Sequence, residues 1–426
     1  MQKNFFQNNA AMLLLTIAAT FTTIIFIDNY CVIFDIFGLL AKIRLLDHPV
    51  SIFFVTPALF WASAYICRRF ALNASGNSMG HVKKALEIVK SETPDLKNLS
   101  SFLSIRVVVV KTISSLLCVL GGGALGREGP AVHMSSAIFA VIGNKFKTVL
   151  PKITLETWIF AGSAAGLAIA FHAPIAGFVF VSEKLLKTKS QHFRNNITWS
   201  LVVILIFAFL CGADPIFMVS DFSFESSLLF FLTAIFIAIF CGLLAFIFKK
   251  TNDHFYQKLS AIKSNFWHLV PITAGLAVAC ISSYSGVHSF SGGIYTVEDA
   301  LSSSDILLSY KEVIGRIFNT IISFIAGCAG GLVAPSITIG AGIGSIASLL
   351  LADIDTNIFI LIGMVGFLAA VLGEPATAAI VVFEITGQSV DRIPLLLSMA
   401  LLALFSFKMV ERVVIALSLK VLPTKT

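Results

Sequence analysis

The chain has 426 residues, of which 57% are hydrophobic and 12% are charged, and its formal net charge is +7 at pH 7. A mean hydropathy of +0.92 excludes a soluble globular protein. The modest positive charge indicates basic loops beside a membrane rather than a surface for nucleic acid. The seven cysteines stand singly, which indicates buried free thiols and neither a metal site nor a cofactor. We therefore expect a membrane protein that binds no nucleic acid.

Apolar stretches long enough to cross a bilayer as helices recur along the chain. The clearest lie at 10–27, 107–125, 158–181, 197–211, 228–248 and 359–372, with shorter ones at 336–351 and 376–383. Short spans are typical of transporters whose helices stop at the bilayer midplane. The longest polar stretches, 83–101 and 251–265, cannot bury a core of their own. We expect one transmembrane domain over 1–426, and basic residues at many turns leave its orientation open.

The segment Gly126-Arg127-Glu128-Gly129-Pro130 lies between apolar stretches at 107–125 and 131–142. Charged side chains at membrane depth are costly, and the glycines and proline indicate that the helix breaks where the charges lie. A broken helix is tolerated in a bilayer where it is buried in protein or lines a cavity. The segment is therefore a candidate ion site with one protonatable group. A direct pair between Arg127 and Glu128 is not expected, because neighbouring helical residues point in different directions.

An internal repeat is visible in the chain. A glycine, a proline and a glutamate recur at identical spacing, each time in an alanine-rich stretch: Gly162, Pro174, Glu183 and Gly363, Pro375, Glu384. The segment 126–130 precedes the first set as 331–335, also of the form Gly-x-x-x-Pro, precedes the second. These matches favour two halves, roughly 10–211 and 228–420. Repeats in transporters often have inverted topology, with the substrate at their interface.

A small anion that enters a low-dielectric medium loses most of its hydration free energy. One helix N-terminus stabilises an anion by only ~0.3–1 kcal/mol at a surface and ~2 kcal/mol when partly buried. Several N-termini with free backbone N–H groups must therefore converge on the ion. The sequence offers three glycine-marked helix starts, at 76–80, 126–130 and 330–335. Glu128 competes with the anion for the same amides, so we expect it to occupy the site when ionised and to leave it when protonated.

At these residues the chain resembles the CLC family of chloride channels and proton–chloride antiporters. The segment GREGP at 126–130 is unaltered, and 162–185 resembles the family helix that begins G-x-A-A-G and ends with paired acids. The segment GGLVAP at 330–335 is similar to the family's G-x-F-x-P. The resemblance implies an all-α polytopic membrane protein with an inverted repeat, whose broken helices meet at the bilayer midplane. It also implies a homodimer with one pore in each subunit.

The resemblance further implies a gate at Glu128 and a set of anion-binding residues: Asn77, Ser78, Met79, Arg127, Gly129, Leu332, Val333, Ala334 and Ile415. Asn77 stands where the family has a serine, although a shift of two residues would place Ser75 there instead. The amide of Asn77 can still donate to an anion. Val333 replaces a family phenylalanine and Ile415 the tyrosine that closes the inner side. Both changes make the inner end wider or less polar.

Lys184 aligns with the inner proton-transfer glutamate of the antiporters. It could hold the inner mouth positive for anions or carry protons itself. It could equally be an anchoring lysine at a helix end beside Lys187. Glu183 is expected to be structural, by capping or pairing nearby, and Glu374 to lie at a helix end at the interface.

The sequence thus predicts transport of chloride or a similar small anion across the lipid bilayer of a prokaryotic inner or plasma membrane, with protons as the coupled ion. A passive chloride channel stays open as the alternative, because Lys184 and Ile415 alter the inner half. A fluoride–proton antiporter is a further alternative, because Val333 departs from the family pattern, although Pro130 and Ala334 match the chloride branch. An enzyme is not expected, since the chain lacks the HExxH and G-x-S-x-G motifs.

Overall fold

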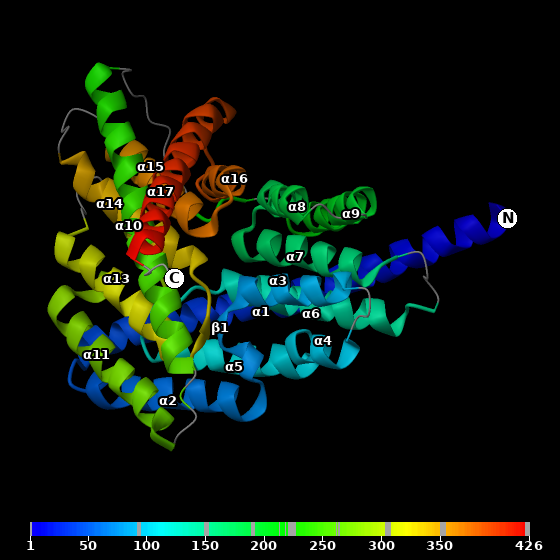
Figure 1. Cartoon of the computed structure of the whole chain (residues 1–426), viewed down its shortest axis with the longest axis horizontal. Helices are drawn as coiled ribbons and strands as arrows, with labels where there is room; N and C mark the ends of the chain where they lie inside the picture. Colours follow the sequence, from blue (N-terminus) through cyan, green and yellow to red (C-terminus); the bar gives the residue numbers. More distant parts are fainter. Residues whose placement is uncertain are drawn as a thin grey trace, which may run out of the picture.

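The computed structural model describes a helical chain in which the two halves lie side by side (Figure 1). The residues it describes are 2–91, 95–148, 153–188, 192–212, 214–217, 219, 227–260, 262, 265–302, 308–349 and 355–421. In this part of the chain, six helices are long and apolar enough to cross a membrane, and the shorter apolar helices lie between them.

The first half begins with a helix that runs well beyond the predicted stretch at 10–27. Its elements are α1 (Gln2–Asp47), α2 (Ile52–Phe70), η1 (Leu72–Ala74), β1 (Gly76–Asn77), α3 (Ser78–Lys90), α4 (Leu96–Phe102), α5 (Ile105–Leu120), α6 (Glu128–Lys145), α7 (Leu155–Phe171), α8 (Pro174–Thr188) and α9 (Phe193–Cys211). The predicted stretch at 158–181 is divided at His172, which has a φ of 50°, and Pro174 then starts α8.

The second half opens and closes with the long helices α10 and α17, which run side by side in Figure 1. Its elements are α10 (Leu228–Ser260), η2 (Asn265–His268), α11 (Leu269–Ser285), η3 (Val287–Ser289), α12 (Ile294–Ser302), α13 (Tyr310–Ile325), β2 (Ala329–Gly330), α14 (Val333–Ser348), α15 (Thr356–Leu372), α16 (Pro375–Ile385), η4 (Val390–Arg392) and α17 (Ile393–Val421). Gly373, with a φ of 75°, ends α15 as His172 ends α7.

The core consists of two tightly packed helix pairs, α6 with α7 and α14 with α15. Both α7 and α15 are buried on all sides, as expected for helices that are apolar all round. The repeated glycines permit this packing. A Cβ at Gly162 would lie 2.8 Å from the carbonyl oxygen of Ser135 on α6, and one at Gly363 would clash with the carbonyl of Gly340 on α14. Each glycine thus brings two helix backbones together in its own half.

The repeated glutamates hold α8 and α16 together by capping each other's helix. Glu183 accepts hydrogen bonds from the backbone amides of Ala376 (3.1 Å) and Thr377 (2.8 Å) at the start of α16. Glu384 accepts them from Ile175 (3.0 Å) and Ala176 (2.6 Å) at the start of α8. A carboxylate is favourable at a helix N-terminus. The reciprocal contacts require the two helices to run in opposite directions, as an inverted repeat predicts.

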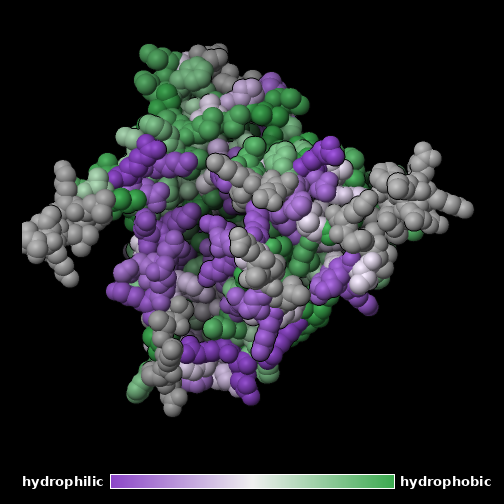
Figure 2. Space-filling view, turned by 45° about the vertical axis from the view of Figure 1, so that its right-hand side comes forward, coloured by the Kyte–Doolittle hydropathy of each residue, from purple (hydrophilic) through white to green (hydrophobic). Residues whose placement is uncertain are grey.

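Basic side chains gather at one side of the helices. Arg68, at the end of α2, donates to the carbonyl of Ile262 and stacks on Trp267, just after α10. Lys249, in the second half of α10, donates to the carbonyl of Val371 at the end of α15 (2.8 Å). Lys187, at the end of α8, pairs with Glu374. The positive-inside rule favours a cytoplasmic location for this side, which is called the cytoplasmic side below. Figure 2 shows one face on which hydrophilic side chains are gathered between hydrophobic ones.

Candidate functional site

Three glycine-marked helix starts meet at one point of the structure. Strand β1 pairs in parallel with β2, in the register Gly76 with Ala329 and Asn77 with Gly330. One residue further on, Gly126 and Gly331 exchange two backbone hydrogen bonds of 2.9 and 2.8 Å. These contacts tie the starts of α3, α6 and α14 together. The first amides of a helix have no partner within it, so three sets of N–H groups are brought to one place.

The glycines are required by how closely these segments approach. A Cβ on Gly129 would lie 2.8 Å from the Cα of Gly331, and one on Gly126 would lie 2.5 Å from Oε2 of Glu128. Gly76 has a φ of +69°, a conformation that favours glycine. Larger residues at these positions would push the helix starts apart.

Glu128 lies at the centre of this junction. The residue is 4% exposed, and its Oε2 accepts a hydrogen bond of 3.3 Å from the backbone amide of Ala334 at the start of α14. A small cavity of about 30 Å³ beside it is lined mostly by apolar side chains, among them Phe171, Phe217 and Val297. The carboxylate therefore occupies an amide site that a substrate anion could also occupy.

Arg127 is directed away from the helix starts and anchors the segment to α1 and α7. Its guanidinium donates to the carbonyl of Cys31 (3.1 Å) and to that of Ala170 (3.4 Å), and it pairs with the carboxylate of Asp35. Its Nε also lies 3.9 Å from Oε1 of Glu128. The expectation that Arg127 and Glu128 do not pair is therefore wrong, because the two side chains lie within ion-pair distance. The distance is nevertheless too long for a hydrogen bond. The reason is that Arg127 is the N-cap residue of α6, so the regular helical directions do not apply to it.

In the first segment, the structure places Asn77 at the N-cap of α3. Its side-chain oxygen accepts from the backbone amide of Gly80 at 3.0 Å, and the residue is exposed. Ser75 instead lies before the turn, with its hydroxyl 3.1 Å from the carbonyl oxygen of Leu72 and 3.5 Å from the hydroxyl of Tyr256. Asn77, rather than Ser75, therefore stands at the helix start. Ser78 and Met79 supply the first amides of α3.

Sequence reasoning misses Lys111, the cation beneath this segment. Lys111 lies on α5 and is completely buried, and its ammonium donates to the hydroxyl of Ser78 at 3.0 Å. It falls inside the run 107–125, which hydropathy treats as one apolar span. An ionisable side chain at membrane depth is itself the signal that could have found it.

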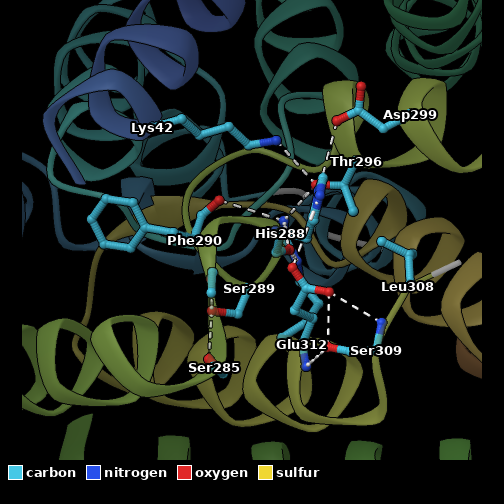
Figure 3. Close-up of polar contacts among 12 residues, drawn as sticks. Lys42, Ser285, His288, Ser289, Phe290, Thr296, Asp299, Leu308, Ser309 and Glu312 are labelled. Carbon is cyan, nitrogen blue, oxygen red and sulfur yellow. Dashed lines mark hydrogen bonds and ion pairs between the residues drawn. The ribbon is translucent and has the colours of Figure 1, made fainter. Parts of the chain in front are cut away.

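One wall of the Glu128 cavity comes from the end of the segment that joins α11 to α12 and from the first turn of α12. Gly293, Ile294 and Val297 line the cavity. Arg316 of α13 fixes this segment by donating to the carbonyls of His288 (2.6 and 3.0 Å) and Ser291 (2.5 Å). Figure 3 shows the adjoining polar cluster, in which Lys42 donates to the Thr296 hydroxyl at 3.1 Å, and His288, Asp299 and Glu312 lie nearby. These contacts hold the wall in place from three helices.

At the cytoplasmic end, Lys184 and Lys187 both pair with the carboxylate of Glu374. Glu374 precedes α16 and is 2% exposed, so it is a buried ion-pair partner and not the interfacial residue that the sequence suggests.

Val333 is buried at the first position of α14, and Leu332 is the N-cap residue of that helix. Leu332, Val333 and Ala334 therefore lie at the helix start next to Glu128.

The structure does not bring Ile415 to this group. Ile415 lies near the end of α17, is 49% exposed, and is not among the residues that line the Glu128 cavity. The reason is visible in the sequence, because residues 395–421 contain neither glycine nor proline. The helix therefore continues without a break and does not turn back toward the site.

Comparison with known proteins agrees with this geometry. A family model described as "Voltage gated chloride channel" matches residues 59–406. The chain belongs to this family, the CLC family. The H(+)/Cl(-) exchange transporter ClcA of Vibrio vulnificus is 25% identical over 361 residues, which cover 81% of this chain and 74% of that protein. With family membership and its apolar helices, the chain is a multi-pass integral membrane protein.

Two solved CLC structures share the fold. A slow cyanobacterial Cl-/H+ antiporter aligns with a TM-score of 0.75 at 20% identity, over 93% of this chain and 94% of that one. A CLC-type fluoride/proton antiporter also aligns with a TM-score of 0.75, at 19% identity, over 94% and 96%. At these identities the likeness establishes the CLC fold, with its inverted repeat and broken helices, and leaves the choice of anion to the site.

Proposed function

We propose that this CLC protein exchanges chloride, or a similar small anion, for protons, with Glu128 as the gate. The observation that carries the proposal is the hydrogen bond from the Ala334 amide to the buried carboxylate of Glu128, where three helix starts meet. An ionised carboxylate is an anion that binds the same N–H groups as the substrate. The similarity to ClcA of Vibrio vulnificus, an H(+)/Cl(-) exchange transporter, supports the same proposal.

In this proposal, the helix starts select an anion and Glu128 couples it to a proton. The amides of Ser78, Met79, Leu332 and Val333 offer N–H groups to the ion, and buried Lys111 adds a positive charge next to them. Ionised Glu128 excludes the anion from the Ala334 amide. A protonated carboxyl has less affinity for that amide, so it leaves and an anion replaces it. One side chain thereby binds a proton and admits an anion in the same step.

A passive chloride conductance is the second candidate, and two observations on the cytoplasmic side favour it. Lys184, which aligns with the inner proton-transfer glutamate of the antiporters, is instead a cation paired with Glu374. Ile415 does not close the inner side of the site, and Asn77 is exposed there. In such a pathway Glu128 is the single gate, because nothing closes the inner end. Anions could then cross whenever Glu128 moves aside, without a proton being transported.

The test uses purified protein in liposomes with an imposed chloride gradient, with chloride efflux and internal pH followed together. For Glu128→Gln we expect proton movement to fall by at least about tenfold, because a titratable transfer group is lost, while chloride efflux continues. The matched control is Glu87→Gln, which removes an exposed acid on α3. It should leave both fluxes as in the wild type.

The other outcomes separate the alternatives. Chloride efflux without proton movement in the wild-type protein would replace exchange by passive conductance. Fluoride flux without chloride flux would make the protein a fluoride–proton antiporter. The homodimer is a further proposal that comes from the CLC resemblance, and the mass of the protein in detergent micelles tests it.

A further inference from the structure

Proton-coupled exchange needs a path by which protons reach Glu128 from the cytoplasm. On the side where the basic helix ends gather, the structure has a cavity of about 290 Å³ lined by Arg68, Lys84, Tyr256 and Trp267. His81 of α3 also lines this cavity. The cavity therefore brings an imidazole, the side chain best suited to proton transfer near neutral pH, to the cytoplasmic side of the anion site.

His81 belongs to a buried group of titratable side chains. It is 9% exposed, and its Nδ1 has no hydrogen-bond partner in the described part of the chain. Its ring centroid lies 5.5 Å from that of His133 on α6, whose Nε2 donates to the carbonyl of Phe102 at 2.9 Å. The charges that act on His81 come from Lys111 on α5 and from Lys84 on its own helix. Burial and the charge of Lys111 oppose a proton on this imidazole, so its unpartnered nitrogen is placed to accept one when Lys111 is neutral.

The same group reaches the anion site through Lys111 and Ser78. The Lys111 ammonium donates to the Ser78 hydroxyl at 3.0 Å. Ser78 in turn lies next to Gly129, the residue that follows Glu128. A Cβ placed on Gly129 would lie 3.5 Å from the Cβ of Ser78. A charge buried with a neutral hydroxyl as its partner is unfavourable, and this arrangement needs a reason beyond packing.

We propose that His81, Lys111 and Ser78 form the inner proton route to Glu128. The Lys111 ammonium gives a proton to the Ser78 hydroxyl, which gives its own proton to the Glu128 carboxylate when this has left Ala334. The neutral amine on Lys111 then takes a proton from protonated His81, and His81 recovers one from water in the cavity. One proton moves at each step, so the net transfer is one proton from the cavity to Glu128. This route rests on the proposed exchange function.

The route differs from one that passes Lys184. Lys184 and Lys187 share the carboxylate of Glu374, on the side formed by α8 and α16. His81 and Lys111 lie instead on α3 and α5, which hold the first anion-binding segment. Substitutions in one group therefore leave the contacts of the other intact, and the two routes can be separated.

The experiment measures protons moved per chloride ion in liposomes for His81→Gln. We expect this ratio to fall at least about tenfold, since a general acid–base group is removed, while chloride efflux persists. The matched control is His172→Gln, the same substitution at a 40% exposed imidazole between α7 and α8. It should keep the wild-type ratio. His81→Glu restores a titratable group, so it should recover most of the coupling, which a purely structural role of His81 would not predict.

Three results would overturn the route. One is a wild-type ratio in His81→Gln, which would leave the exchange function intact. Another is loss of coupling in Lys184→Met but not in His81→Gln, which would assign the route to the Lys184 side. The third is chloride flux without protons in the wild-type protein, which would remove the exchange function together with the route. If His81→Gln does not fold, the comparison of His81→Glu with His81→Asn provides the same test.

Discussion

The two ends of the α8–α16 pair are related by the repeat, and they differ most clearly in charge. At both ends a glutamate, Glu183 or Glu384, caps the opposite helix. One end then has Ala173 and Ile385, which are apolar, whereas the repeat-related positions at the cytoplasmic end are Glu374 and Lys184, which pair with each other. Because the apolar end holds the same helices without an ion pair, the pair is not a requirement of the fold.

This comparison separates the features that the repeat architecture requires from the features that occur on one side of the protein only. Features present in both halves, such as the close-packing glycines Gly162 and Gly363, stabilise the architecture. Features found at only one end of the repeat-related pair are specific to that side of the membrane. Lys184 and Glu374 are of the second kind. The two kinds of feature should therefore differ in their contribution to stability as well as in position.

The largest effect is expected when the lysines are removed and Glu374 is left. In Lys184→Met with Lys187→Met, a carboxylate that is 2% exposed loses both of its cationic partners. An uncompensated buried charge costs about 3–5 kcal/mol. Thermal unfolding in detergent micelles should show a correspondingly large loss of stability.

The control for this variant removes two lysines from exposed positions, Lys83→Met with Lys258→Met. The net charge changes equally, but no buried partner is left behind, so the stability should change by less than about 1 kcal/mol. Equal losses in the two double variants would mean that net charge, and not the buried carboxylate, determines the effect.

A smaller and symmetric effect is expected from the capping glutamates. Glu183→Gln and Glu384→Gln each weaken two hydrogen bonds to backbone amides at a helix start. We expect each to cost about 1–2 kcal/mol, with Glu183 the more costly because it also accepts from the Thr377 hydroxyl at 2.5 Å. Thermal unfolding of both variants checks this. A cost at only one end would show that the capping is symmetric in geometry but not in energy.

The sequence allows the scaffold to be predicted better than the inner side of the site. The segment 126–130 and the repeated residues are local patterns, and the structure brings the three predicted helix starts together. The pair of Lys184 with Glu374 joins residues far apart in the chain, so no local pattern indicates it. Ile415 was open to prediction, because an uninterrupted helix follows from the absence of glycine and proline between 395 and 421.

The smallest effect is expected when the cytoplasmic end is given the residues of its repeat-related counterpart, in Lys184→Ile with Glu374→Ala. The net charge is unchanged and no buried charge remains, and replacing a buried ion pair by apolar residues is often neutral or stabilising. Lys187, about half exposed, can return to water. Stability within about 1 kcal/mol of the wild type is therefore expected, with the ratio of protons to chloride retained. A loss as large as that of the double lysine variant would show that the pair stabilises the fold after all. A loss of coupling alone would instead assign Lys184 to the proton path.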